Sequence, residues 1–235
     1  SLETMMATVA RAFPPRVEVT WRDLPEAGAG PVAVWRNLRF VARHAGPVNH
    51  VAGHVHYAAI PPGRRAVLTV ADVRSAFAGR PLRDRLVRWM WFVWPARRAG
   101  RITTISEFTR EELLALAPFA RDRVRVIPVP CDPRHRFDPR PFREECPRVL
   151  CVGVKPNKNL ERTAGALRGI RAVLAVVGDP TPAQRETLAR CGIEHEIVTR
   201  PTDEGMRQQY RRCDLLCYAS TYEGFGMPIV EAQAT

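Results

Sequence analysis

The chain has 235 residues, of which 46% are hydrophobic and 26% are charged; these are ordinary values for a globular protein and exclude wholesale disorder. Its apolar runs are short and broken by arginine or proline, so none approaches the roughly 20 residues of a membrane-spanning helix. The formal net charge of +12 favours an anionic partner, which could be phosphate, acidic lipid, acidic glycan or nucleic acid.

The positive charge is confined to one part of the sequence. Residues 1–143 hold 24 arginines against 12 acidic residues, whereas residues 144–235 hold 12 basic and 12 acidic residues. A basic part followed by a neutral part predicts two units with different partners. A second interpretation stays open, because 34 arginines against 2 lysines also fit the amino-acid usage of a GC-rich genome.

The six cysteines favour free thiols. None belongs to a C-x-x-C pair, five lie at or beyond Cys146, and several fall inside apolar segments. This pattern fits a protein of a reducing cytoplasm better than a disulfide framework or a zinc site.

Hydrophobic periodicity predicts alternating helices and strands in the basic part. In chain order the expected elements are a helix over 2–13, a strand over 17–21, a helix over 32–43, a strand over 66–70, a helix over 82–98, a strand over 101–105, a helix capped by Ser106, and a strand over 124–129.

The pattern breaks and then starts again. Residues 130–147 contain five prolines and four arginines with little apolar periodicity, which is typical of a linker. Beyond it we expect strands over 149–152, 172–177, 194–198 and 215–218, alternating with helices over 159–167, 182–191 and 204–213. The prediction is an α/β protein with a domain over 1–130, a linker over 131–147 and a second domain over 148–235, each built on a parallel sheet.

Two strand-to-helix loops of the second domain carry chemistry, because ligands of parallel sheets bind beyond the carboxyl ends of the strands. The first loop, residues 153–159, contains Lys155 and Lys158, the only lysines in the sequence. A compact ammonium near a helix start adds charge to the backbone N–H groups that hold a phosphate. The alternative is a solvated turn with two exposed lysines.

The second loop runs from Ser220 to Glu231 and combines glycines with carboxylates. Gly224 and Gly226 allow the backbone to approach a ligand closely. Glu223 and Glu231 are separated by seven residues and can flank one pocket, where one would address a sugar and the other a ribose. Alternatively, Glu231 is only an acid of the first helical turn.

The segment from Glu223 to Glu231 resembles the E-x7-E signature of glycosyltransferase family 4, whose members are retaining enzymes of the GT-B fold. Further segments resemble the family in the same order along the chain; these are residues 67–72, 102–108, 152–160 and 176–178. The resemblance implies two Rossmann-like parallel-sheet domains that face each other across a cleft. The acceptor would bind mainly to the first domain and the donor to the second.

The resemblance also implies a reaction. Such an enzyme moves a sugar from a nucleotide-diphosphate sugar to a glycan or lipid-linked acceptor with retention of configuration. It uses no cofactor beyond the donor substrate and no metal ion, and the sequence contains no Asp-x-Asp pair. By resemblance Lys158 contacts the donor diphosphate, Glu231 binds the ribose hydroxyls, and Glu223 is the catalytic residue beside the sugar. Further donor-binding residues would be Gly153, Lys155, Gly224, Phe225, Gly226 and Met227, with Asp72 on the acceptor side.

Three departures from the family pattern affect this expectation. Val154 stands where the family often has arginine or threonine, and Ala71 stands where many members have a histidine near the donor sugar. The nearby His50, His54 and His56 are candidates to compensate for that histidine. The pattern also lacks the family's first strand and last elements, so we expect a fragment trimmed at both ends with little activity by itself. A donor-binding pseudo-enzyme is the alternative.

One aromatic and basic segment, residues 88–98, allows two interpretations. It holds three of the five tryptophans between arginines, as helices at an anionic membrane surface do. Trp89, Phe92 and Val93 are also spaced as a core stripe, which we favour. A nucleic-acid-binding module is disfavoured, because the arginines accompany no recognised motif. The family resemblance implies a bacterial enzyme of polysaccharide synthesis in the cytoplasm, which would meet a lipid-linked acceptor at the inner face of the membrane.

Overall fold

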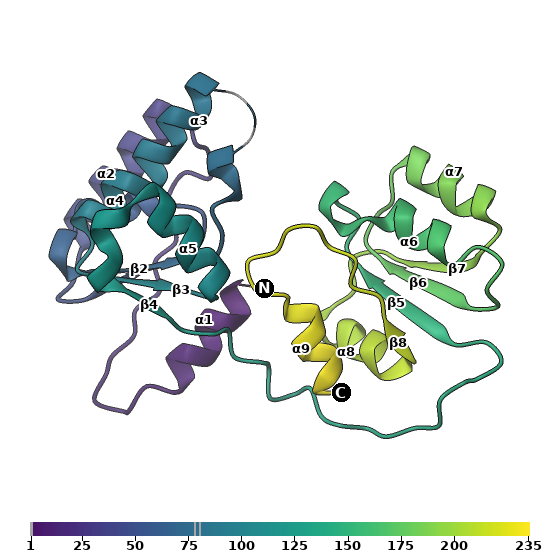
Figure 1. The fold of residues 1–235 in the computed structure, drawn as a ribbon. Coiled ribbons are helices and arrows are strands. Elements are labelled where there is room, and N and C mark those ends of the chain that lie inside the picture. Colours follow the sequence, from purple (N-terminus) through teal and green to yellow (C-terminus); the bar gives the residue numbers. More distant parts are fainter. Residues whose placement is uncertain (1, 78, 80) are drawn as a thin grey trace. The chain divides into compact units, whose positions relative to one another are not determined.

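The computed structural model describes residues 2–77, 79 and 81–235. The chain forms two compact units, one ending at Pro130 and the other starting at Cys131. Each unit is an α/β structure on a four-stranded parallel sheet (Figure 1).

The first unit contains a sheet in the order β1-β2-β3-β4, with all neighbouring strands parallel. Its strands are β1 (Asn49–Val51), β2 (Ala66–Val70), β3 (Arg101–Thr104) and β4 (Val124–Val126). Its helices are α1 (Leu2–Arg11), α2 (Pro31–His44), α3 (Pro81–Val87), α4 (Trp94–Arg98) and α5 (Glu107–Leu116). Short 3-10 turns connect them at His56–Ala59, Gly63–Arg65, Arg74–Phe77 and Pro118–Arg123. The Ser106 hydroxyl accepts the Thr109 N–H and caps α5 as predicted.

One predicted strand of this unit is wrong and one strand was missed. Residues 17–21 are irregular, and Val17, Val19 and Trp21 are exposed. Alternation alone cannot make a strand where no neighbouring strand supplies hydrogen bonds and a buried face. The missed strand is β1, which has only three residues and is too short to show a period.

The predicted helix over 82–98 contains a π-helical segment. Residues Arg88–Val93 are π-helical between α3 and α4. The Trp94 N–H therefore bonds to the carbonyl of Trp89, five residues earlier, and the two indole rings stack with centroids 4.9 Å apart. Phe92 is buried in the core, but Trp89 is about half exposed, so the predicted core stripe is wrong for Trp89. No helix of the described chain is both long and apolar enough to cross a membrane.

The second unit has a sheet in the order β7-β6-β5-β8, again wholly parallel. Its strands are β5 (Arg148–Val152), β6 (Val173–Val177), β7 (Glu194–Val198) and β8 (Leu215–Leu216). Its helices are α6 (Leu160–Ala166), α7 (Pro182–Cys191), α8 (Asp203–Arg212) and α9 (Met227–Gln233), with a 3-10 turn at Pro156–Lys158. Every strand and helix predicted after residue 147 is present, with ends shifted by a few residues.

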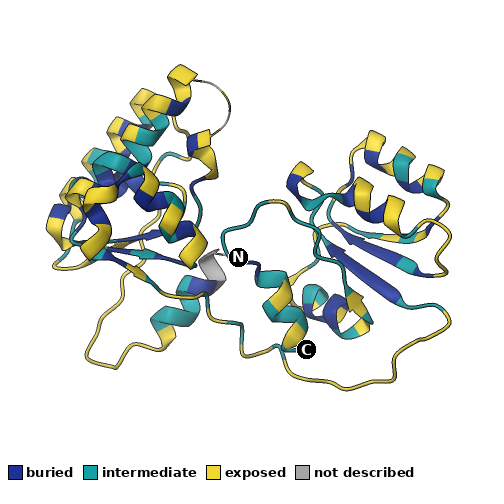
Figure 2. Ribbon diagram, in the orientation of Figure 1, coloured by how far each residue is buried: buried dark blue, intermediate teal, exposed yellow. Residues whose placement is uncertain are grey.

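Helices cover both faces of this sheet (Figure 2). On one face Cys151, Leu174 and Val176 pack with residues of α6 and α7. On the other face Leu150, Ala175 and Val177 pack with Tyr210 of α8 and Ala232 of α9. Strands β5 and β6 are thus apolar on both sides, as is typical of a doubly wound parallel sheet.

The segment predicted as a linker packs along the second unit. The Asp214 side chain, only 1% exposed, forms ion pairs with Arg140 and Arg143. It also accepts the backbone N–H of Arg148 at the start of β5. Burial by itself would raise the pKa of Asp214, but the Arg148 N–H and the two guanidinium groups outweigh it and lower the pKa. Asp214 therefore attaches residues 140–143 to the sheet.

We predict that Asp214→Asn lowers the free energy of unfolding by about 1–3 kcal/mol at neutral pH, because a buried charged hydrogen-bond acceptor is lost. The folded protein holds this carboxylate at a lowered pKa, so its contribution is present above about pH 4 and is lost as the pH falls through the folded value. Urea unfolding at several pH values should show a smaller acid loss in the variant than in the wild type.

The control is Asp179→Asn, which removes a carboxylate paired with Arg185 at an exposed position. Its effect should be close to zero, as for most surface ion pairs. Equal acid sensitivity of the wild type and Asp214→Asn would contradict the assignment.

Candidate functional site

The two candidate loops follow neighbouring strands. Residues 153–159 follow β5, and residues 217–226 follow β8, which pairs with β5. Counted along the chain within this unit, the strand order is third, second, first, fourth, so the direction of winding reverses between β5 and β8. Ligands of such sheets bind beyond the carboxyl ends of the strands at this reversal. The topology brings both loops to that point.

Lys158 and Glu223 meet directly at this edge. The Lys158 Nζ lies 2.6 Å from Glu223 Oε1, and their side chains are 16% and 27% exposed. The ammonium also lies 5.6 Å from the ring centre of Tyr218. Burial and then the charge of Glu223 raise the pKa of Tyr218 to about 12, which keeps its hydroxyl neutral. The result is a partly solvated ammonium–carboxylate pair supported by an aromatic ring.

Gly153 makes room for the lysine stem. Its φ of 94° lies in the left-handed region, where a side chain is strained. A Cβ at this position would lie 3.0–3.4 Å from the Cε, Cγ and Cδ atoms of Lys158. Glycine therefore suits the turn here, and a larger residue would require the Lys158 stem to shift by a few tenths of an ångström.

Two asparagines that were not among the predicted site residues join the loops. Asn157 is buried, and its amide donates to the Tyr222 carbonyl and to Glu223 Oε1. Asn159, in the left-handed conformation, donates to the Ala219 carbonyl. Glu223 is thus held by a lysine and an amide from the first loop. The available signal was the Asn-x-Asn spacing around Lys158, which places two amides beside a charged residue.

The second loop ends in a left-handed glycine. Gly226, with φ 96°, precedes the first residue of α9, Met227. Glu231 lies one turn into this helix and accepts the Tyr210 hydroxyl at 2.6 Å through Oε2. Glu231 is therefore held by α8, whereas Glu223 is held by the first loop. Among the other predicted donor-side residues, Lys155 is exposed, and Gly224, Phe225 and Met227 are partly exposed.

The predicted acceptor-side residue belongs to the first unit. Asp72 follows β2, and its carboxylate accepts the N–H of Arg74. Two of the three histidine alternatives, His50 and His56, have structural partners, whereas His54 is exposed. His56 is buried and donates to the Trp91 carbonyl, and burial, followed by the charge of His54, lowers its pKa to about 4. His56 therefore does not line an open site, contrary to the expectation, while His50 bonds to Thr69 in the neighbouring strand.

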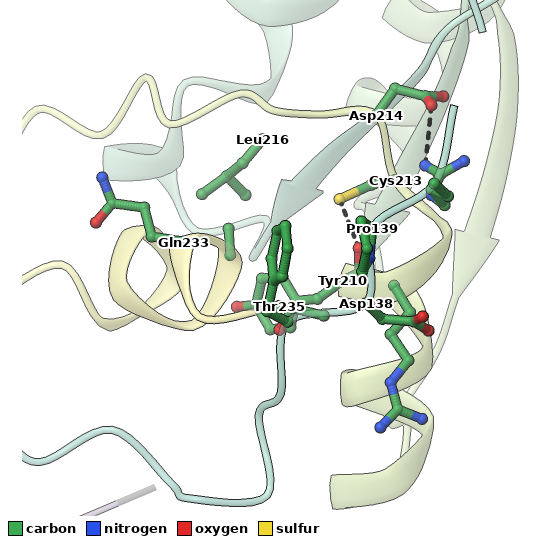
Figure 3. A pocket seen from close by; sticks show the side chains of 12 residues that line it. Asp138, Pro139, Tyr210, Cys213, Asp214, Leu216, Gln233 and Thr235 are labelled. Atoms are coloured by element: carbon green, nitrogen blue, oxygen red, sulfur yellow. Dashed lines mark hydrogen bonds and ion pairs between the residues drawn. The ribbon is translucent and has the colours of Figure 1, made fainter. Parts of the chain in front are cut away.

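A pocket of about 390 Å³ lies elsewhere in the second unit, between residues 137–140, the end of α8 and the end of α9 (Figure 3). Tyr210 and Asp214 are among its lining residues, whereas Lys158, Glu223 and Glu231 are not. This pocket is distinct from the site formed by the two loops.

Two protein-family models match the chain. The model described as Glycosyltransferase Family 4 matches residues 5–135, more than half of the chain, and the model described as Glycosyl transferases group 1 matches residues 146–235. The chain belongs to glycosyltransferase family 4. The resemblance inferred from the sequence motifs is confirmed.

The chain is similar to one curated relative in sequence and to two solved structures in fold. The chain is 27% identical over 173 residues to the MMP alpha-(1→4)-mannosyltransferase of Mycolicibacterium hassiacum, and this match covers 67% of the chain and 42% of the relative. It is similar in fold to HepE of Anabaena, solved with UDP and glucose, with a TM-score of 0.66, 17% identity and coverage of 86% of this chain and 60% of HepE.

A trehalose-6-phosphate synthase structure matches with a TM-score of 0.56, 12% identity and coverage of 86% of this chain and 61% of that chain. At these identities the structural likeness concerns the fold. It confirms the predicted GT-B class of two parallel-sheet α/β domains. The chain spans about two fifths of the length of the mannosyltransferase and three fifths of HepE.

We predict that Gly153→Ala destabilises the second unit more than Gly192→Ala does. Both glycines have a positive φ, so both variants carry the strain of a left-handed alanine, about 1–2 kcal/mol. A Cβ at Gly192 meets no atom within 4 Å, whereas one at Gly153 presses on Lys158. The additional cost should be about 1 kcal/mol, measured by urea unfolding. Equal losses would show that the Lys158 stem adapts freely.

Proposed function

We propose that this chain carries the donor-binding machinery of a retaining glycosyltransferase. The enzyme would move a hexose from a nucleotide-diphosphate sugar to a glycan or lipid-linked acceptor and would need no metal ion. The observation that carries the proposal is the Lys158–Glu223 pair, held where the winding of the second sheet reverses. The names of the relatives support it, since one transfers mannose and another binds UDP and glucose.

The geometry suits the charges of this reaction. The bond between the sugar C1 and the diphosphate oxygen breaks, and the diphosphate leaves with the bonding electrons. The oxygen of the acceptor hydroxyl forms the new bond to C1 on the same face, and its proton passes to an oxygen of the departing diphosphate. Lys158 would stabilise the departing diphosphate, and Glu223 would face the positive charge that develops at the sugar ring. The pairing of the two side chains keeps an ammonium and a carboxylate at the place where both charges arise.

Asn157 contributes to this arrangement by holding Glu223. Its amide shares Glu223 Oε1 with the Lys158 ammonium, at 3.1 Å and 2.6 Å. When a diphosphate draws Lys158 away, the amide would still hold the carboxylate. The proposed catalytic residue therefore keeps one fixed partner during the reaction.

The proposal is tested by a thermal-shift panel of UDP, GDP and their hexose conjugates on this chain. At least one nucleotide should raise the melting temperature, and Lys158→Ala should abolish the shift because the diphosphate loses its ammonium. The matched control is Arg190→Ala, which removes an exposed cation from α7. A nucleotide shift that survives Lys158→Ala unchanged would contradict the proposed diphosphate contact.

We also propose that the first unit contacts an anionic membrane surface in the bacterial cytoplasm, as suits a lipid-linked acceptor in polysaccharide synthesis. Residues 81–98 carry five arginines and one acidic residue, Asp84, whose side chain is buried. Leu82, Leu86 and Trp89 on the same segment are exposed by 86%, 62% and 48%. Exposed apolar side chains among arginines that outnumber the acidic residues are typical of helices that bind anionic lipid.

Flotation with vesicles tests this contact. The chain should float with vesicles that contain anionic lipid and not with neutral ones. The double variant Leu82→Ser and Trp89→Ser should reduce flotation at least several-fold. The control Phe137→Ser removes an exposed aromatic side chain of the second unit and should float like the wild type. Absence of binding to anionic vesicles, or binding that the double variant retains, would contradict the proposal.

A further inference from the structure

One carboxylate of the E-x7-E segment, that of Glu231, bonds to a buried side chain. Glu231 Oε2 accepts the hydroxyl of Tyr210 at 2.6 Å. Within the described part of the chain, no residue donates to the other oxygen, Oε1. The side chain is partly exposed. Glu231 therefore has one oxygen fixed by the protein and one available to a ligand.

Tyr210 is well placed to fix that oxygen. It is 3% exposed and packs in the core between α8 and the sheet, with Leu150, Ala175 and Val177. Its ring lies edge-on to the ring of His135, with centroids 5.5 Å apart. A ring packed on several sides has few alternative rotamers, so its hydroxyl is a rigid donor.

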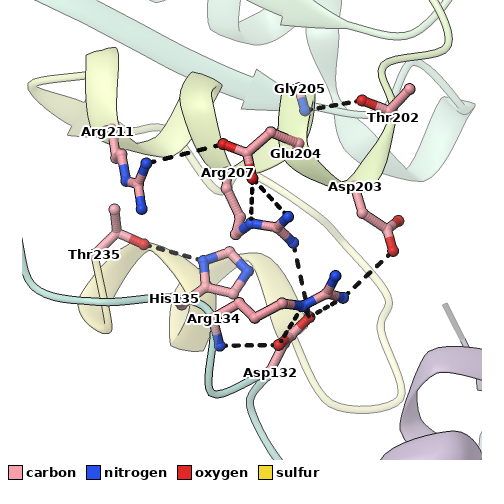
Figure 4. A network of polar contacts seen from close by, with 10 residues as sticks. All are labelled: Asp132, Arg134, His135, Thr202, Asp203, Glu204, Gly205, Arg207, Arg211 and Thr235. Carbon is pink, nitrogen blue, oxygen red and sulfur yellow. Dashed lines mark hydrogen bonds and ion pairs between the residues drawn. The ribbon is translucent and has the colours of Figure 1, made fainter.

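The backbone of Glu231 is fixed from the same side. The Thr235 hydroxyl donates to the Glu231 carbonyl at 2.8 Å. Because that hydroxyl has a single proton, His135 Nδ1, 3.1 Å away, donates to the Thr235 oxygen (Figure 4). Asp132 and Arg134 of the same segment join it to α8 through Arg207 and Asp203. The segment 132–135 thus supports the helix that presents Glu231.

We propose that Tyr210 is a positioning residue for ribose recognition. Its hydroxyl holds Oε2 of Glu231, so that Oε1 is directed to accept a hydrogen bond from a ribose hydroxyl of the donor nucleotide. This inference rests on the proposed function, in which Glu231 binds the ribose. It adds a residue outside the two loops and gives the Tyr210 hydroxyl a role that a phenylalanine at this position would lack.

The electrostatic environment agrees with this role. Burial, followed by the hydrogen bond to Glu231, raises the pKa of Tyr210. The hydroxyl is therefore protonated over the whole physiological range and always donates. A buried hydroxyl that donates to a carboxylate forms one of the stronger kinds of hydrogen bond.

The test compares Tyr210→Phe with the wild type by calorimetric titration. The probes are UDP or GDP, whichever binds in the nucleotide panel, and the matching 2′,3′-dideoxynucleoside diphosphate. Tyr210→Phe should weaken binding of the ribonucleotide about tenfold, as expected for a hydrogen bond to a charged group. It should change binding of the dideoxy compound by less than about twofold, since that ligand has no ribose hydroxyl for Glu231. Equal weakening for both ligands would overturn the proposal and leave Tyr210 a purely structural role.

Two further variants distinguish loss of the Tyr210–Glu231 hydrogen bond from a general effect of removing a buried hydroxyl. Tyr57→Phe removes another buried tyrosine hydroxyl, which accepts the Asn37 amide in the first unit, and should leave both affinities unchanged. In a Glu231→Ala background, which leaves no acceptor for the Tyr210 hydroxyl, Tyr210→Phe should cost much less ribonucleotide affinity than in the wild type, because the two changes remove the same interaction. Additive effects would overturn the proposal even if Tyr210→Phe folds poorly by itself.

The failure of the proposed function is distinguishable from the failure of this inference. If Lys158→Ala does not weaken nucleotide binding, the donor site itself is wrong. If Lys158→Ala and Glu231→Ala both weaken ribonucleotide binding but Tyr210→Phe does not, the donor site stands and the positioning role of Tyr210 is rejected.

Discussion

The pairing of β8 with β5 is the constraint on which the candidate site depends. β6 and β7 continue the sheet on one side of β5, while β8 adds to its other side, so the loops after β5 and β8 emerge next to each other. Residues 60 or more positions apart then become neighbours. Lys158 pairs with Glu223, and the Asn157 and Asn159 amides bond to residues of the second loop. Without the reversal of winding, these polar groups would have no common edge.

In the second unit Glu223 and Glu231 have different hydrogen-bond partners, and these partners suit different chemical roles. Glu223 is held by an ammonium and an amide, both of which lie on the loop that would meet the diphosphate. Glu231 is held by a neutral hydroxyl from the hydrophobic core. A carboxylate paired with a lysine can exchange partners when a charged ligand enters, whereas one bonded to a packed tyrosine keeps its position. The first arrangement suits charge stabilisation, and the second suits recognition of uncharged hydroxyls.

The segment 131–147 has a structural role that its composition hides. Proline and arginine content predicts a linker, yet its arginines and Asp132 form ion pairs with α8 and with Asp214 at the start of β8. His135 reaches the edge of Tyr210 and the hydroxyl of Thr235. The segment therefore packs against the elements that carry Glu231.

In the first unit, the π-helical turn at Arg88–Val93 exposes Trp89, which regular helical spacing would bury.

The sequence by itself determined the α/β class, the family and nearly all elements after residue 147, because apolar strands, helix caps and the E-x7-E segment are local patterns. It failed for residues 17–21 and for Trp89, where a missing neighbouring strand and a π-helical turn override local periodicity. Only the tertiary structure decided which polar groups meet. Asn157, Tyr210 and Asp214 bond to partners 21 or more positions away in the sequence. The order of the strands, rather than the local sequence, brings these partners together.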